Sequence, residues 1–136
     1  MTGPIEMHLW AASSAVDTDF TAKLLDSYPS DGDYAGGLAI NITDSIIRAR
    51  YRNGWDKPEM MTQNCPYEFV FKLYPTSYVF KAGHRIRLDI SSSNWPRFDV
   101  NPNTGGPLGI ERLHQIATQT VFHDEVKASH IVLPLQ

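Results

Sequence analysis

The chain has 136 residues, of which 42% are hydrophobic and 20% charged, and its formal net charge is −3. This length and composition fit one domain, residues 1–136, with a continuous core. The slight acidic excess argues against nucleic acid or an anionic membrane as a partner. The single cysteine excludes an intrachain disulfide and a cysteine-based zinc cluster.

The first residues show no positively charged region followed by an apolar run, which is the pattern of a signal peptide. No apolar stretch approaches the ~20 residues that a bilayer-spanning helix needs. The expected location is therefore the cytoplasm, although a secreted domain without disulfides would have the same composition.

Hydrophobic and polar residues alternate with a period of two along most of the chain. The alternating segments are, in order, 5–12, 20–25, 38–43, 47–52, 68–73, 85–90, 118–122 and 131–133. Because successive side chains of a strand point to opposite faces, each segment is typical of a strand with one buried face. About eight such strands predict an all-β fold, an antiparallel jelly-roll β-sandwich.

Turn-forming residues separate these segments. Pro29–Asp33 and Lys81–Gly83 are predicted turns between strands, and Asn53-Gly54 is predicted to end the strand that carries three arginines. Two other stretches, 76–80 and 109–115, each fit a single helical turn.

One long irregular stretch, Ser91–Pro107, contains three prolines and two glycines, which deny it regular structure. Long loops in compact domains are usually either functional or disordered. Trp95 and Phe98 within this stretch favour an ordered loop that packs on another surface.

Motifs for catalysis or cofactor binding are missing. None of the nine glycines has a serine two positions later, so the Gly-x-Ser-x-Gly elbow of α/β-hydrolases is absent. There is no Gly-x-Gly-x-x-Gly, no phosphate-binding loop and no His-Glu-x-x-His. We expect no catalytic residue, no cofactor and no metal; a triad assembled from scattered positions is the weaker interpretation.

Asp17 and Asp19 are close enough in sequence to supply oxygens to a calcium ion. A carboxylate pair without further oxygen ligands is a weak metal signal, however. The favoured alternative is a short acidic loop in which the aspartates cap their own turn.

Arg48, Arg50 and Arg52 fall on one face of a predicted strand, and Arg85 and Arg87 on one face of another. If these strands were neighbours, the arginines would form a stripe suited to acidic groups of a partner, because guanidinium forks suit interface ion pairs. The alternative is a solvated face balanced by acidic residues.

Three tryptophans, Trp10, Trp55 and Trp95, are candidates for a sugar-stacking platform, although core and interface packing is their commoner role. His84, and His123 with Asp124, lie next to predicted strands, where structural roles are also commoner. Partner or ligand contact is expected, in particular, from Trp95, Arg97, Phe98, Trp10, Arg48 and Arg50.

Beyond single motifs, several stretches together match a known family with their spacing preserved. They are residues 2–11, 17–24, 41–52, 96–99, 101–105 and 119–124, with the strongest match at Ala82–Asn94, reading AGHRIRLDISSSN. Through them nearly the whole chain resembles the C-terminal domain of the Xaa-Pro dipeptidyl-peptidase and cocaine-esterase family.

This resemblance implies a galactose-binding-like jelly roll that packs against an α/β-hydrolase catalytic domain, in cis or in trans, and helps to shape its pocket. In that family the upstream domain carries the catalytic serine, aspartate and histidine and cleaves esters, amides or dipeptides after proline. None of those residues maps onto this chain, so the chain alone is expected to be inactive. The alternative is a free-standing module that binds a sugar or another small ligand.

The family domain usually begins with an extra strand before the Thr2-Gly3-Pro4 turn, whereas this sequence begins at that turn. Without such a strand, a sheet edge keeps unpaired backbone groups. We therefore expect a homo-oligomer, formed by strand pairing or through the face that would meet a hydrolase domain.

Overall fold

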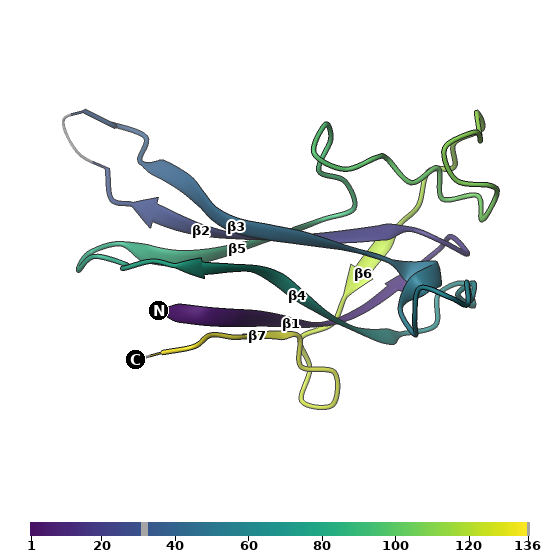
Figure 1. Cartoon of the computed structure of the whole chain (residues 1–136), viewed down its shortest axis with the longest axis horizontal. Coiled ribbons are helices and arrows are strands. Elements are labelled where there is room, and N and C mark those ends of the chain that lie inside the picture. Colours follow the sequence, from purple (N-terminus) through teal and green to yellow (C-terminus); the bar gives the residue numbers. More distant parts are fainter. Residues whose placement is uncertain (31–32, 136) are drawn as a thin grey trace.

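The computed structural model describes residues 1–30 and 33–135. Its strands form two facing layers, and the long loops after β5 lie at the end of the sandwich opposite the N-terminus (Figure 1). The predicted all-β sandwich is confirmed. The described residues contain seven strands and one short 3₁₀ helix.

The first sheet is built around β1 (Thr2–Ser13). β4 (Tyr67–Ser77) pairs with one edge of β1 along almost its full length. The two short strands β6 (Gln119–Val121) and β7 (His130–Val132) pair with separate stretches of the other edge. All three pairings are antiparallel.

The second sheet has β2 (Asp19–Tyr28) at its centre, between β3 (Leu38–Arg48) and β5 (Arg85–Ser91). Both pairings are again antiparallel. β3 packs over β4, and the Thr43 hydroxyl donates a hydrogen bond of 2.7 Å to the Tyr74 carbonyl across the two sheets. β5 therefore lies on the same side of the sandwich as β6 and β7.

The core consists of the inward-facing side chains of the two central strands and their neighbours. Phe20 of β2 and Phe69 of β4 meet across the sheets with their ring centroids 4.9 Å apart. The remaining buried members alternate along their strands as the sequence predicted; they include Ile5, Met7, Leu9, Ala22, Leu24 and Leu73.

The predicted strand at residues 47–52 is wrong beyond Arg48. Segments 38–43 and 47–48 belong to one continuous strand, β3, which then turns into the 3₁₀ helix η1 (Ala49–Tyr51). The backbone leaves the sheet here because the Ala49 amide donates to the Thr18 carbonyl and the Arg50 amide donates to the Asp17 carboxylate. These tertiary bonds replace the ladder bonds that would continue a strand.

The predicted turns at Lys81–Gly83 and Asn53-Gly54 are present: the His84 amide donates to the Lys81 carbonyl, and the Gly54 amide donates to the Tyr51 carbonyl. Part of the Pro29–Asp33 turn lies outside the described residues. No helical turn forms at 76–80 or 109–115, because β4 continues through Ser77 and the later stretch is irregular.

Candidate docking surface

A groove runs along the edges of β3 and β4 and continues under the loop after β5. It consists of three adjoining hollows of about 450, 320 and 500 Å³. The first two hollows share Ile46, Tyr51 and Trp55, and the second and third share Arg48, Asp99 and Leu108. Shared walls make this one continuous depression at one side and one end of the sandwich.

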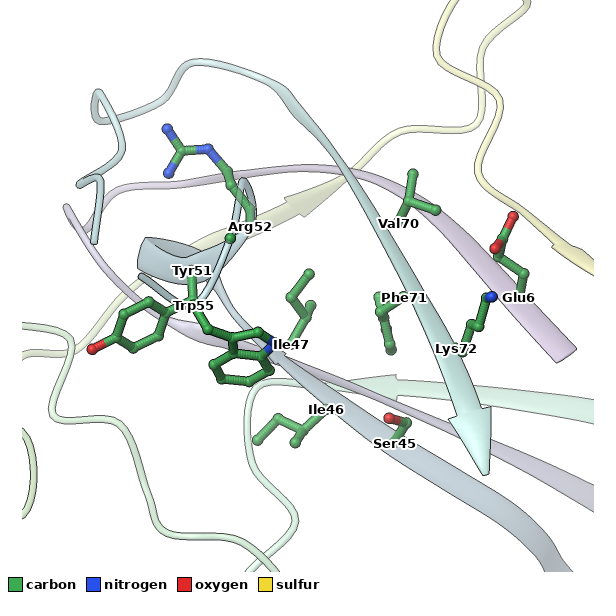
Figure 2. Close-up of a pocket in the computed structure, with 11 residues that line it drawn as sticks. Glu6, Ser45, Ile46, Ile47, Tyr51, Arg52, Trp55, Val70, Phe71 and Lys72 are labelled. Atoms are coloured by element: carbon green, nitrogen blue, oxygen red, sulfur yellow. The ribbon is translucent and has the colours of Figure 1, made fainter. Parts of the chain in front are cut away.

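The centre of the groove is an aromatic pair. Trp55 is 79% exposed, and its ring stacks on Tyr51 with centroids 5.6 Å apart; Figure 2 shows the two rings side by side at one end of the first hollow. The Asn53-Gly54 turn, in which Gly54 has a φ of 144°, presents Trp55 to solvent. An exposed tryptophan held by a turn and a neighbouring ring is already ordered, so its burial by a partner costs little entropy.

Charged side chains form the rim. Arg52 is held by a 2.8 Å ion pair with Glu59, and its guanidinium lies 4.5 Å from the centroid of the Tyr67 ring. At the other end of the first hollow, Glu6 and Lys72 are paired residues of neighbouring strands and lie close together in Figure 2. An apolar centre with a polar rim is the usual anatomy of a protein interface.

The loop before β6 lines the third hollow through Leu108, Gly109, Glu111 and His114, and it also carries exposed apolar side chains. Ile110 and Leu113 are about three-quarters exposed, and Ile116 is 97% exposed. Leu108, at the start of this stretch, lines two of the three hollows. Three exposed apolar side chains within seven residues of one loop are typical of an interaction surface.

A buried ionic network holds this end of the groove in place. The Arg48 guanidinium binds both oxygens of Asp19, at 2.8 and 2.9 Å, and the Arg50 Nε donates to Asp17 at 2.8 Å. Asn101 bridges the two carboxylates, since its Nδ2 donates to Asp17 at 2.9 Å and to Asp19 at 2.8 Å. Arginine donors thus occupy the carboxylates that the sequence offered as calcium ligands.

The same network fastens the long loop to the sandwich. The Arg50 Nη2 donates to the Gly106 carbonyl at 3.0 Å, and the Asn101 side-chain oxygen accepts from the Asn103 amide at 2.9 Å. Asn103 in turn donates to the Gln115 carbonyl. Hydrogen bonds within the chain therefore hold the loop against the sandwich.

The expected contact residues lie in different places. Phe98 and Arg48 line the groove. Trp95 is 73% exposed in the same loop but outside the groove lining, while Arg97 forms a 2.8 Å ion pair with Asp44. Arg50 is buried in the network described above.

Trp10 lies on the outer face of β1, where its amide donates to the Ser129 hydroxyl. The three tryptophans thus stand on separate elements, and within the described chain no tryptophan ring stacks on another. Sugar stacking on one isolated ring, that of Trp95, stays a prediction.

The arginine stripe predicted from two neighbouring strands does not form. β2 separates β3 from β5, so Arg48 and Arg87 are not on adjacent strands. Arg87 instead binds Asp89 of its own strand through two contacts of 2.7 and 3.1 Å. The sequence could not reveal this because strand order is a property of the whole sheet.

His84 and His123, the two histidines next to predicted strands, occupy structural positions. His84 contacts both oxygens of the buried Asp26 at 2.9 Å, and the Tyr78 hydroxyl donates to the same carboxylate at 2.7 Å. His123 forms an isolated bridge with Ala128, around a turn in which Asp124 accepts two backbone amides. In the parts of the chain that the structure describes, no serine or cysteine side chain is hydrogen-bonded to a histidine.

Residues 1–30 and 33–135 contain no cluster of three or more histidine, cysteine or acidic side chains arranged to hold a metal ion. They also contain no helix that is long and apolar enough to cross a membrane.

Comparison with known proteins identifies the family of the chain. Residues 1–132 match the family described as the X-Pro dipeptidyl-peptidase C-terminal non-catalytic domain. The chain is 42% identical over 137 residues to the cocaine esterase of Rhodococcus sp. (strain MB1 Bresler), which covers 99% of this chain and 23% of the esterase. It is 28% identical to a putative serine esterase of Mycobacterium bovis, of which it covers 22%.

Solved structures agree with these matches. An α-amino acid ester hydrolase superposes with a TM-score of 0.90 at 34% identity, over 98% of this chain and 23% of that protein. An aminopeptidase from a marine sediment archaeon superposes with a TM-score of 0.85 at 27% identity, over 97% of this chain and 23% of that protein. In each case the chain spans about a quarter of the larger protein.

Proposed function

Because the chain belongs to the family of X-Pro dipeptidyl-peptidase C-terminal non-catalytic domains, we propose that it is an accessory domain that packs on an α/β-hydrolase catalytic domain. The catalytic domain hydrolyses an ester or peptide bond, and this chain contributes shape and stability to it. The chain has no elbow motif for a nucleophilic serine and is inactive alone.

The observation that carries the proposal is the groove with Trp55 at its centre. Burial of an exposed aromatic side chain in a partner surface is among the largest single contributions to a protein interface. Ile110, Leu113 and Ile116 are exposed in the same loop as Leu108, which lines the groove, so this loop adds apolar surface beside it.

The lengths of the relatives support a partner of this kind. The matched region is about a quarter of the cocaine esterase and of the α-amino acid ester hydrolase, and three quarters of each protein lie outside it. The family is named for a non-catalytic C-terminal domain. A catalytic domain on the same polypeptide is therefore the favoured partner, and a separate polypeptide is the alternative.

A chimera tests the proposal. The matched quarter of the cocaine esterase is replaced by this chain, which shares 42% identity with it, and hydrolysis of a p-nitrophenyl ester is measured against temperature. We expect an active chimera. Trp55→Ala should weaken the contact between the domains by about 2 kcal/mol, the scale of an aromatic hot spot, and so lower the temperature at which activity is lost.

Two controls separate docking from folding. The isolated chain carrying Trp55→Ala should unfold at the same temperature as the unchanged chain, because this side chain is mostly in solvent. Val126→Ala, at an equally exposed apolar residue in the turn before β7, should leave the chimera unchanged. Equal losses in chimera and isolated chain, or no loss in either, would show that the groove is not the docking surface.

A further inference from the structure

The segment between η1 and β4 begins with a closed loop that carries Trp55. The chain leaves η1 at Arg52 and returns to it at Glu59, whose amide donates to the Arg50 carbonyl at 2.7 Å. We call residues 52–59 the Trp55 loop. It contains no helix or strand, so its shape depends on the bonds that close it.

The Glu59 side chain uses both carboxylate oxygens to close this loop. Its Oε1 accepts a hydrogen bond from the Arg52 Nη2 at 2.8 Å, and its Oε2 accepts one from the Asn53 Nδ2 at 2.8 Å. Because Glu59 is 60% exposed, these bonds add little to the stability of the whole domain. Their effect is local: one residue at the end of the loop fixes both residues that precede Gly54 and Trp55.

Arg52 is the firm end of this arrangement. Its side chain is only 4% exposed, and its guanidinium lies 4.5 Å from the centroid of the Tyr67 ring of β4. Its Nη1 also donates to the Ala49 carbonyl and to the Glu59 backbone carbonyl. Arg52 thus belongs to the body of the sandwich, and the bonds of Glu59 extend this order to the loop.

Trp55 has few contacts of its own. Within residues 1–30 and 33–135 its indole N–H has no hydrogen-bond partner, and its ring lies on Tyr51 with an angle of 29° between the two planes. It follows Gly54, whose φ of 144° is a conformation that glycine adopts without strain. The direction in which the ring points in Figure 2 therefore depends on the path of the loop.

The residues that hold the loop are not the residues that form the groove. Arg52, Gly54 and Trp55 line the first hollow, whereas neither Glu59 nor Asn53 is among the described residues that line any of the three hollows. A partner in the groove would therefore meet Trp55 and not the carboxylate that holds its loop. A side chain that is fixed before binding loses less conformational entropy on docking.

We propose that Glu59 is the positioning residue of the docking surface. It acts through Trp55, because its carboxylate holds the Trp55 loop in the orientation in which the indole ring meets a catalytic domain. This inference rests on the proposed docking at the groove and adds a residue that the groove itself does not contain. Without the Glu59 carboxylate, Arg52 and Asn53 lose their shared acceptor, and docking has to fix the path of the loop each time.

A double-mutant cycle in the chimera tests this role. Glu59→Ala should lower the inactivation temperature by at least half of the shift that Trp55→Ala causes. The double variant should lower it no further than Trp55→Ala alone, because without the indole ring the loop has nothing to position. A residue that contributed to docking independently of Trp55 would give additive shifts.

NMR relaxation of the isolated chain supplies a readout that a general loss of stability would not change. In Glu59→Ala the order parameter of the Trp55 indole N–H should fall, whereas those of the Trp10 and Trp95 indoles should stay the same. Asn53→Ala removes one of the two bonds and leaves Arg52 paired, so it should give a smaller fall and a smaller shift in the chimera. This second variant decides the matter if Glu59→Ala, which unpairs Arg52, fails to fold.

Gln63→Ala is the matched control. Gln63 lies later in the same segment, is exposed, and donates its Nε2 to the Ser14 carbonyl at 2.7 Å. Its substitution removes a similar exposed bond outside the Trp55 loop, so it should change neither the inactivation temperature of the chimera nor the Trp55 order parameter.

Additive shifts in the cycle, or an unchanged Trp55 order parameter in both Glu59→Ala and Asn53→Ala, would overturn the positioning role. The failure of the proposed function has a different signature. If the order parameter fell while Trp55→Ala left the chimera unchanged, Glu59 would still fix the ring, and only the docking of a catalytic domain at this groove would be refuted.

Discussion

Asp26 is an ionisable residue buried near the end of β2, and its carboxylate contacts His84 and Tyr78. Burial alone would raise the pKa of its carboxyl, but hydrogen bonds from His84 and Tyr78, together with the nearby positive charge, hold the pKa below its ordinary value of 3.8. The hydrogen bond to Asp26, with smaller effects of Tyr28 and burial, raises the pKa of the Tyr78 hydroxyl. The ionised carboxylate thus joins β2 to the segment between β4 and β5.

This site should make the chain sensitive to acid. Since the folded pKa of Asp26 is depressed, its contribution to stability is present above the unfolded pKa of 3.8 and is lost as the pH falls through the folded value. Asp26→Asn should lower the melting temperature at neutral pH and flatten its decline in acid, measured by circular dichroism from pH ~7 to ~2.

Asp124→Asn is the matched control, because the pKa of this carboxyl is also lowered, chiefly by the Lys127 amide, in an exposed turn. We expect a smaller loss at neutral pH from this variant. If the two variants behaved alike, the burial of Asp26 would not matter to stability.

At the scale of elements, the decisive contact is between the long loop and the start of β2. The Asn101 side-chain amide bridges Asp17 and Asp19, and this residue is almost fully buried. Two carboxylates this close repel each other unless cations and donors compensate them, and here Arg48, Arg50 and Asn101 do so.

Substitution of Asn101 should therefore destabilise the fold and also make the loop after β5 more mobile. Asn101→Ala removes both donated bonds and should cost about 1–3 kcal/mol of unfolding free energy, the usual penalty for leaving buried acceptors unpaired. Asn101→Asp should cost more, because it adds a third carboxylate to the cluster. Urea denaturation measures the cost, and hydrogen exchange should show faster exchange of the Asn103 and Gln115 amides.

The outcome that would contradict this account is Asn101→Asp being as stable as the unchanged chain at neutral pH. A fold that tolerated three clustered carboxylates would have to hold the network open to solvent, contrary to its observed burial.

The period-two pattern predicted the sandwich, because the alternation of buried and exposed side chains along a strand depends only on neighbours in the sequence. Ile5, Met7 and Leu9 alternate in the sequence and are buried in the structure. Phe98 has a different signal, an aromatic residue in a proline-rich loop; it lines the groove, and its contact with a partner stays a prediction.

Features that join distant segments could not be predicted in this way. The arginine strand ends at Arg48 because Asp17, 33 residues from Arg50, takes the Arg50 amide. The groove escaped prediction for the same reason: Ile46, Trp55 and Leu108 meet only once β3 and the loop after β5 have folded together. The sequence gives one indication that Trp55 is exposed: it directly follows an Asn-Gly turn and lies outside any strand pattern.

At the scale of the whole molecule, the groove and the β5 edge lie on opposite sides of the sandwich. The groove follows β3 and β4, whereas β5 lies on the side of the short strands β6 and β7. β1 and β2, the central strands of the two sheets, separate them. A partner that docks in the groove therefore does not reach the β5 edge through the same contacts.

Substitutions on the two sides should therefore act independently, as substitutions at distant sites without shared partners usually do. In the chimera, Trp55→Ala should lower the inactivation temperature, whereas Asp89→Arg at the partly exposed β5 edge should leave ester hydrolysis and the inactivation temperature unchanged. Loss of hydrolysis with Asp89→Arg would mean that the catalytic domain contacts the β5 edge instead of, or as well as, the groove.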